Sequence, residues 1–166
     1  RSRRQRQMCI RDRGNRDRIA GLILESPVID WRSVLRFQAR AAGMRAPLPD
    51  LAMSALSVPL TARLSGAENA ISFDSLDIVA RADELKVPIL ILHSDDDGFV
   101  PADASHALQQ ARPDLVTMPA FSGARHTKIW NYDQTGWSDA ITGWLAAQGF
   151  SCLLYTSDAA DDSLRV

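Results

Sequence analysis

One short run of residues limits the possible folds more than any other feature of the sequence. Residues Val87–His93 read VPILILH, with four consecutive Ile and Leu side chains after the proline. A strand with one face in water alternates apolar and polar residues, whereas an unbroken apolar run is typical of a strand covered by helices on both faces. We therefore predict a buried strand in a parallel sheet, and an α/β fold around it.

Strands and helices are predicted in alternation along the rest of the chain. Short apolar runs predict strands over Ala20–Glu25 and Asp114–Pro119. Helical spacing of apolar residues predicts four helices, over Ser33–Ala42, Asp74–Leu85, Asp103–Ala111 and Tyr132–Ala147. Three prolines divide the segment 43–71, which predicts short helices joined by turns and would suit a lid over a pocket. Such alternation favours a parallel sheet flanked by helices.

Charge and composition exclude several classes of function. Residues 14–150 hold 12 Lys and Arg against 16 Asp and Glu, and this acidic balance argues against a nucleic-acid partner. No apolar run approaches the roughly 18–20 residues of a membrane-spanning helix. Both cysteines, Cys9 and Cys152, lie near the ends, so the middle holds no cysteine metal site. We expect a soluble cytoplasmic protein without a metal or cofactor.

The two ends differ from the middle. The opening RSRRQRQMCIRDR holds six Arg and has no periodicity, and CLLYTSDAADD stands near the other end. Both strings resemble translated sequencing-adapter DNA, as it occurs in assembled metagenomic reading frames. We expect residues 1–14 and 150–166 to be disordered and artefactual, and a domain over 15–149 that is truncated on both sides.

Three aspartates follow the predicted central strand directly. The segment LHSDDDGFVP places Asp95, Asp96 and Asp97 at the carboxyl end of that strand, where open α/β sheets bind ligands and perform chemistry. An acidic cluster in a loop is also typical of a solvated turn or a helix cap, so the cluster alone leaves both interpretations open. His126 follows the next predicted strand through the loop FSGAR. An acid after one strand and a histidine after the next is a more specific arrangement.

This arrangement resembles the α/β-hydrolase superfamily, especially its lysophospholipase and serine aminopeptidase-like branch. The family pattern H-G-x-x-D-x-x-V-P followed by G-x-x-H is matched here by His93, Asp97, Val100, Pro101, Gly123 and His126. The strand near Gly21–Glu25 is similar to the strand after the nucleophile helix in these enzymes. The segment from about 32 to 73 lies where they insert a helical cap. The resemblance implies the C-terminal half of an α/β-hydrolase fold, over residues 16–148.

The resemblance also implies a chemistry. It makes Asp97 the acid and His126 the base of a catalytic triad in a serine hydrolase that acts on small-molecule carboxylic esters, or on small amides and peptides. The imidazole would take the proton of the serine hydroxyl, and the carboxylate would hold the imidazole in the right tautomer. Asp95 and Asp96 are interpreted as supporting or helix-capping residues.

The nucleophile is missing from the match. The elbow G-x-S-x-G occurs nowhere in the sequence, and its nearest approach, Gly136 to Ala140, lies in the last predicted helix. In the family order the elbow precedes the strand at Gly21, so we expect it upstream of Arg1, and we expect this chain alone not to hydrolyse esters. Ser94 and Arg125 also replace smaller residues of the family pattern.

Two other functions stay open at this point. A Cys or Asp nucleophile would make the parent protein a hydrolase of the dienelactone hydrolase or dehalogenase type. A broken triad would instead make it a non-catalytic α/β-hydrolase-like binding protein. The retention of both Asp97 and His126 argues against the binding protein, and the sequence predicts no particular oligomeric state.

Overall fold

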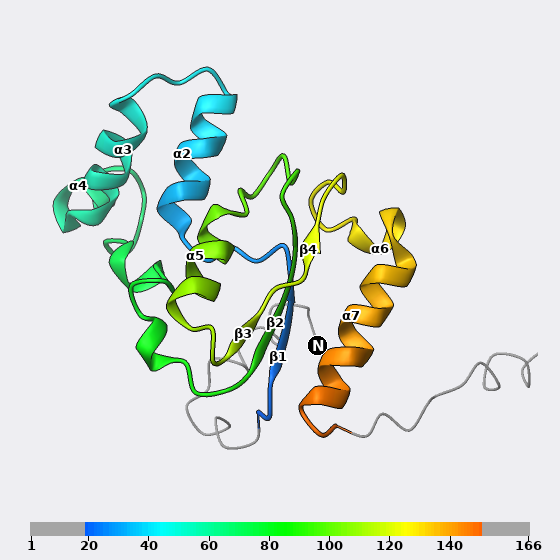
Figure 1. The fold of residues 1–166 in the computed structure, drawn as a ribbon. Coiled ribbons are helices and arrows are strands. Elements are labelled where there is room, and N and C mark those ends of the chain that lie inside the picture. The colour runs from blue at the N-terminus through cyan, green and yellow to red at the C-terminus, as the bar shows by residue number, and fades with distance from the viewer. Residues whose placement is uncertain (1–18, 151–166) are drawn as a thin grey trace, which may run out of the picture.

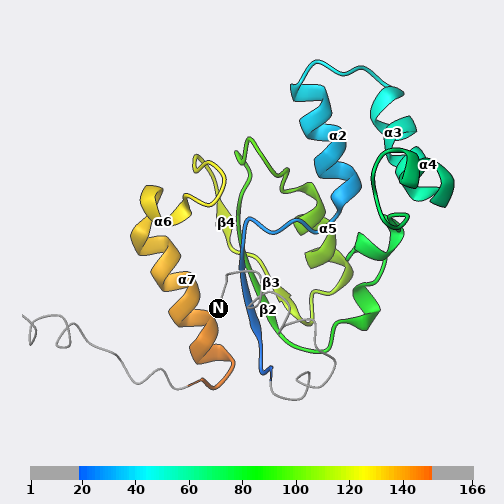
Figure 2. The same cartoon turned by 180° about the vertical axis from the view of Figure 1, so that it is seen from behind.

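The computed structural model of the 166-residue chain describes residues 19–150 (Figure 1). The predictions made for residues 1–14, and for the last segment beyond Phe150, fall outside the described residues. Helices lie on both sides of a small central sheet, and a second group of helices extends from one end of it (Figure 1, Figure 2).

The sheet is parallel throughout. Its strands are β1 (Leu22–Glu25), β2 (Ile89–Ser94), β3 (Val116–Thr117) and β4 (Ala120–Phe121). β2 lies in the middle, with β1 along one edge and both β3 and β4 on the other. The register pairs Glu25 with Leu92 and His93 with Ala120. The prediction of an α/β fold with a parallel sheet flanked by helices is therefore confirmed.

Strand β2 is buried on both faces, as the unbroken apolar run predicts. Ile89 and Ile91 belong to a core that includes Leu108 of helix α5 (Asp103–Ala111). Leu90 and Leu92 belong to a second core with Ile129 of helix α6 (Ile129–Tyr132) and Trp144 of helix α7 (Gln134–Ala147). The alternation of side chains along a strand sends these two sets to opposite faces. The predicted bounds of α5 agree with the observed ones.

Three helices lie between β1 and β2 in the sequence, although the two strands pair directly in the sheet. Helix α2 (Trp31–Ala41) begins two residues before its predicted start, because the Asp30 carboxylate accepts hydrogen bonds from the backbone N–H groups of Arg32 and Ser33. Helices α3 (Leu48–Ser57) and α4 (Pro59–Leu64) follow. They bear out the prediction of short helices joined by turns over 43–71.

The predicted helix over Asp74–Leu85 is wrong. This segment forms two single 3₁₀ turns, Asp74–Leu76 and Ala82–Glu84, with extended backbone at Asp77 between them. Asp77 pairs with Asp30 in an antiparallel bridge, and its carboxylate accepts a hydrogen bond from the Ala80 N–H. Aspartate side chains compete in this way with the hydrogen bonds of a helix. Of the apolar residues that suggested a helical face, Val79 packs against the core on the α5 side of the sheet, whereas Ala80 is exposed.

The C-terminal elements are more divided than predicted. The strand predicted over Asp114–Pro119 covers only β3 in the structure, and β4, which the sequence did not indicate, follows it. The predicted helix over Tyr132–Ala147 begins instead at Gln134, because Asp133 caps it by accepting a hydrogen bond from the Gly136 N–H at 2.8 Å. Between residues 19 and 150, no helix is long and apolar enough to cross a membrane.

Candidate active site

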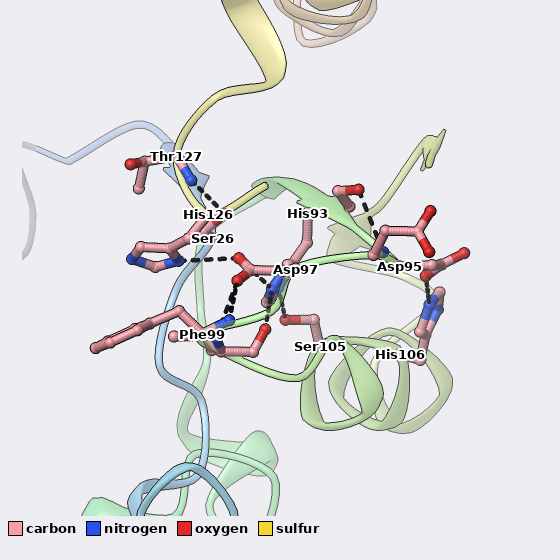
Figure 3. Close-up of polar contacts among 12 residues, drawn as sticks. Ser26, His93, Asp95, Asp97, Phe99, Ser105, His106, His126 and Thr127 are labelled. Atoms are coloured by element: carbon pink, nitrogen blue, oxygen red, sulfur yellow. Dashed lines mark hydrogen bonds and ion pairs between the residues drawn. The ribbon is translucent and has the colours of Figure 1, made fainter. Parts of the chain in front are cut away.

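The turn that follows β2 buries Asp97. Its side chain is fully buried, and the residue as a whole is 5% exposed. One carboxylate oxygen, Oδ1, accepts hydrogen bonds from the backbone N–H groups of Phe99 and Val100, both at 2.9 Å. The other oxygen, Oδ2, lies 2.9 Å from Nδ1 of His126 (Figure 3). The structure thus brings together the two residues that the sequence indicated as acid and base.

These contacts favour the ionised form of Asp97. Burial acts to raise the pKa of this carboxyl, but hydrogen bonds from Val100, His126 and Phe99 outweigh it and leave the pKa below its usual value. An isolated buried carboxyl would show the opposite shift. The site is therefore built to keep a negative charge beside the histidine.

The loop between β4 and α6 presents His126. Gly123 in this loop has φ +78°, a left-handed conformation that favours glycine, and a Cβ there would collide with the Tyr132 side chain. The loop then carries the imidazole back over the carboxyl end of β2. The Phe99 ring lies 5.2 Å from the imidazole, centre to centre.

The hydrogen bond to Asp97 decides which nitrogen of His126 can act as a base. An ionised carboxylate only accepts, so Nδ1 of His126 must donate and carries the proton. In the neutral ring the opposite nitrogen, Nε2, is then the free acceptor. Nε2 makes no hydrogen bond to any residue between 19 and 150, and the side chain is 33% exposed. The imidazole is available to take a proton from a group outside this pair.

The neighbouring aspartates support the two loops. The Asp95 carboxylate is hydrogen bonded to Nε2 of His106 of α5 at 2.7 Å. The Asp96 carboxylate accepts a hydrogen bond from the Gly123 N–H at 2.6 Å. Neither contacts His126 in the described part of the chain. Their sequence interpretation as supporting residues agrees with these contacts, although the partners could not be read from spacing.

His93 is a fully buried structural residue of β2. Its Nε2 lies 3.0 Å from the Val100 carbonyl, and its Nδ1 lies 2.8 Å from the Ser105 hydroxyl. A carbonyl only accepts, so Nε2 of His93 carries a proton. The same nitrogen is 3.4 Å from Oδ2 of Asp97. His93 therefore fixes the acid turn between β2 and α5.

The sequence did not single out Ser26, which also reaches the site. It follows β1, is 5% exposed, and its hydroxyl accepts a hydrogen bond from the Thr127 N–H at 3.2 Å (Figure 3). Ser26 stands before Pro27, and this pair looked like the end of a strand and nothing more. No spacing rule relates two residues that lie 101 positions apart.

Helix α2 lies over the acid turn. The Gln38 side chain donates a hydrogen bond to the Phe99 carbonyl at 2.6 Å. Next to this contact is a cavity of about 380 Å³ whose lining combines α2, the acid turn and the start of α5. Its lining residues are Phe37, Asp95, Asp97, Pro101, Ala102, Asp103 and His106. The cavity gives a small molecule room beside the buried acid.

Two further chemistries lack a suitable arrangement of side chains among residues 19–150. No group of three or more His, Cys, Asp or Glu side chains is arranged to hold a metal ion there. Ser138, in the segment that resembles a nucleophile elbow, lies within α7, and no hydrogen bond joins it to His126.

No protein-family model and no curated protein matches the chain. Solved structures similar to it include an acetyl ester-xyloside bifunctional hydrolase from Caldicellulosiruptor lactoaceticus, with 15% identity and a TM-score of 0.47. They also include the esterase RhEst1 from Rhodococcus sp. ECU1013, with 18% identity and a TM-score of 0.44. The alignments cover 79% and 78% of this chain but only 43% and 56% of those chains. The chain thus spans about half the length of these structures.

Proposed function

We propose that residues 15–149 are the C-terminal part of an α/β-hydrolase domain, with a cap over about 32–73, and that Asp97 and His126 are its catalytic acid and base. The observation that carries the proposal is the 2.9 Å contact between Asp97 Oδ2 and His126 Nδ1 at the carboxyl end of a parallel sheet. The acid is buried and hydrogen bonded, and Nε2 of the base has no partner in residues 19–150.

The pair would activate a hydroxyl nucleophile. His126 Nε2 takes the hydroxyl proton as the nucleophile attacks the ester carbonyl, and returns it to the leaving group when the intermediate collapses. Asp97 holds the ring with Nδ1 protonated and stabilises the imidazolium between these steps. Its lowered pKa suits this role, because the carboxyl stays ionised at neutral pH.

The nucleophile belongs to a segment that pairs with β1 in the longer protein. β1 uses only one of its edges among the described residues, and Ile23 on it is 40% exposed. A further parallel strand along that edge would bring its own carboxyl end to the side of the sheet where Asp97 and His126 lie. Small carboxylic esters are the substrate class, with small amides as the weaker alternative.

The test uses the longer protein that contains this sequence together with the segment before it. Hydrolysis of p-nitrophenyl acetate and butyrate is measured for the parent protein and for His126→Ala and Asp97→Asn. In triad enzymes such changes lower kcat by about 10³-fold or more. Asp114→Asn serves as the matched control, since this aspartate also pairs with a basic side chain, that of Arg112, but neither lines the cavity nor contacts Asp97 or His126. Its kcat should fall by less than about threefold.

Two results would contradict the proposal. Full turnover by His126→Ala would remove the histidine from the chemistry. A parent protein that hydrolyses no ester and reacts with no fluorophosphonate probe would instead be a binding protein of this fold. If an upstream cysteine or aspartate is labelled instead, that residue and not a serine is the nucleophile. The proposed roles of Asp97 and His126 would then stay unchanged. The chain of 166 residues alone should show no turnover in the same assay.

A further inference from the structure

Two residues with strained backbones meet next to the acid and the base. Ser26 has φ +46° and Thr127 has φ +52°, and they are the only residues other than glycine with positive φ between 19 and 150. A left-handed conformation is unfavourable for a residue with a side chain, and a β-branched residue adopts it rarely. Strain of this kind persists where surrounding contacts hold it, often at functional sites.

One hydrogen bond joins these two residues. The Ser26 hydroxyl oxygen accepts from the Thr127 N–H at 3.2 Å, and Thr127 is the residue directly after His126 (Figure 3). Ser26 itself is fixed by its own N–H, which donates to the Leu92 carbonyl at 2.9 Å. The base loop is therefore tied, through one buried hydroxyl, to the ends of β1 and β2.

The same hydroxyl has a proton left to donate. A serine hydroxyl that accepts one hydrogen bond can still donate one, and the Asp97 carboxylate beside it only accepts. The Ser26 hydroxyl is one of the groups that lower the pKa of Asp97. Ser26 thus holds the backbone next to His126 through a hydrogen bond and also favours the ionised form of the carboxylate that orients the ring.

We propose that Ser26 is a positioning residue, whose hydroxyl sets the geometry of the Asp97 and His126 pair by holding both at once. It is not a catalytic residue, because it acts through the other two. Its importance for catalysis rests on the proposed hydrolase function. The effect of Ser26 on Asp97 and Thr127 does not depend on that function, so the positioning role and the hydrolase function can be refuted separately.

The experiment is an NMR study of this chain and three variants. Ser26→Ala removes the hydroxyl, Ser26→Gly removes it and also relieves the positive φ, and Ser26→Thr keeps it. The pKa of Asp97 is followed through its carboxyl carbon, and hydrogen exchange is measured at the Thr127 amide. His126 and His93, the other titratable groups facing Asp97, are unchanged in every variant.

The expected result has three parts. The pKa of Asp97 rises in both Ser26→Ala and Ser26→Gly and returns to the original value in Ser26→Thr. The Thr127 amide exchanges roughly fivefold to tenfold faster in the first two variants, as the loss of one hydrogen bond predicts. In the longer hydrolase, Ser26→Gly lowers kcat and leaves KM unchanged.

An unchanged Asp97 pKa in a folded Ser26→Gly protein overturns the proposal, since that variant lacks the hydroxyl without adding strain. Equal exchange at the Thr127 amide in the original chain and in a folded Ser26→Gly variant also overturns it, because the hydroxyl would then not hold that backbone. Absence of esterase activity in the longer protein would count against the hydrolase function and leave this result unaffected.

Discussion

The Asp96 carboxylate accepts a hydrogen bond from the Gly123 N–H at 2.6 Å, and this contact joins the acid turn to the base loop. Asp96 precedes the buried acid by one residue, and Gly123 precedes His126 by three. The distance between the two proposed catalytic groups therefore depends on a link that is itself exposed to solvent.

Removal of this link should loosen the base loop. Asp96→Ala is expected to lower the free energy of unfolding by about 1–2 kcal/mol, because the Gly123 N–H loses a charged acceptor. Urea denaturation measures this change. Asp139→Ala is the matched control, since Asp139 is exposed and its carboxylate makes no hydrogen bond in residues 19–150. Equal losses in the two variants would show that the link contributes nothing.

Gly123→Ala should be costlier than a change at another glycine of similar backbone. Gly66 has φ +88° and open space around it, so Gly66→Ala adds only backbone strain of about 1 kcal/mol. A Cβ on Gly123 adds a collision with the Tyr132 side chain to that strain. The melting temperature of Gly123→Ala should therefore fall further than that of Gly66→Ala. An equal fall in the two variants would mean that Tyr132 moves aside freely.

The contribution of Asp97 to the stability of the fold should decrease as the pH falls. Burial raises the pKa of this carboxyl, but its hydrogen bonds leave it below the ordinary 3.8 in the folded state, so folding favours the carboxylate. The resulting stabilisation is complete above about pH 4 and is lost as the pH falls through the lower pKa of the folded state.

Asp97→Asn tests this pH dependence. Unfolding free energies of the chain and the variant should differ most at neutral pH and approach each other as the pH falls below 3.8 toward the lower pKa of the folded state. The asparagine keeps an oxygen for the Phe99 and Val100 N–H groups but carries no charge. A difference that stays constant from pH 7 to pH 3 would mean that the charge of Asp97 adds no stability.

Both faces of β2 should contribute to stability. Leu90→Ala and Ile91→Ala are each expected to cost about 2–4 kcal/mol, because both side chains are fully buried but in different cores. Leu60→Ala, at a position 70% exposed, should change stability by less than about 0.5 kcal/mol. A small cost at only one of the two buried positions would indicate that the corresponding layer of helices is loosely packed.

The sequence predicts the sheet better than the segments between its strands. The run at β2 leaves little choice, because four consecutive Ile and Leu residues need cover on both faces. The segment 74–85 also has helical spacing. However, the Asp77 carboxylate accepts a hydrogen bond from the Ala80 N–H, and the Asp77 backbone pairs with Asp30. Such competition depends on a residue 47 positions away, which periodicity does not record.

The acid and base could be proposed from the order of two loops, whereas their supports could not. The carboxyl ends of parallel strands lie at the same edge of a sheet, so Asp97 and His126 are expected together at that edge. The contacts of Asp96 with Gly123, and of Ser26 with Thr127, are set by loop conformations with positive φ. No local pattern marks a serine or threonine for that conformation.

The separation of 101 positions between Ser26 and Thr127 has a consequence for synthesis on the ribosome. β1 is synthesised before β2, and the turn that holds Asp97 follows about 70 residues after β1, so both precede the base loop. A nascent chain stalled before residue 126 would have a partly formed sheet and an Asp97 carboxylate without its histidine partner. The pair of acid and base can therefore form only after most of the sheet has been synthesised, while helix α7, which covers one face of β2, is still to follow.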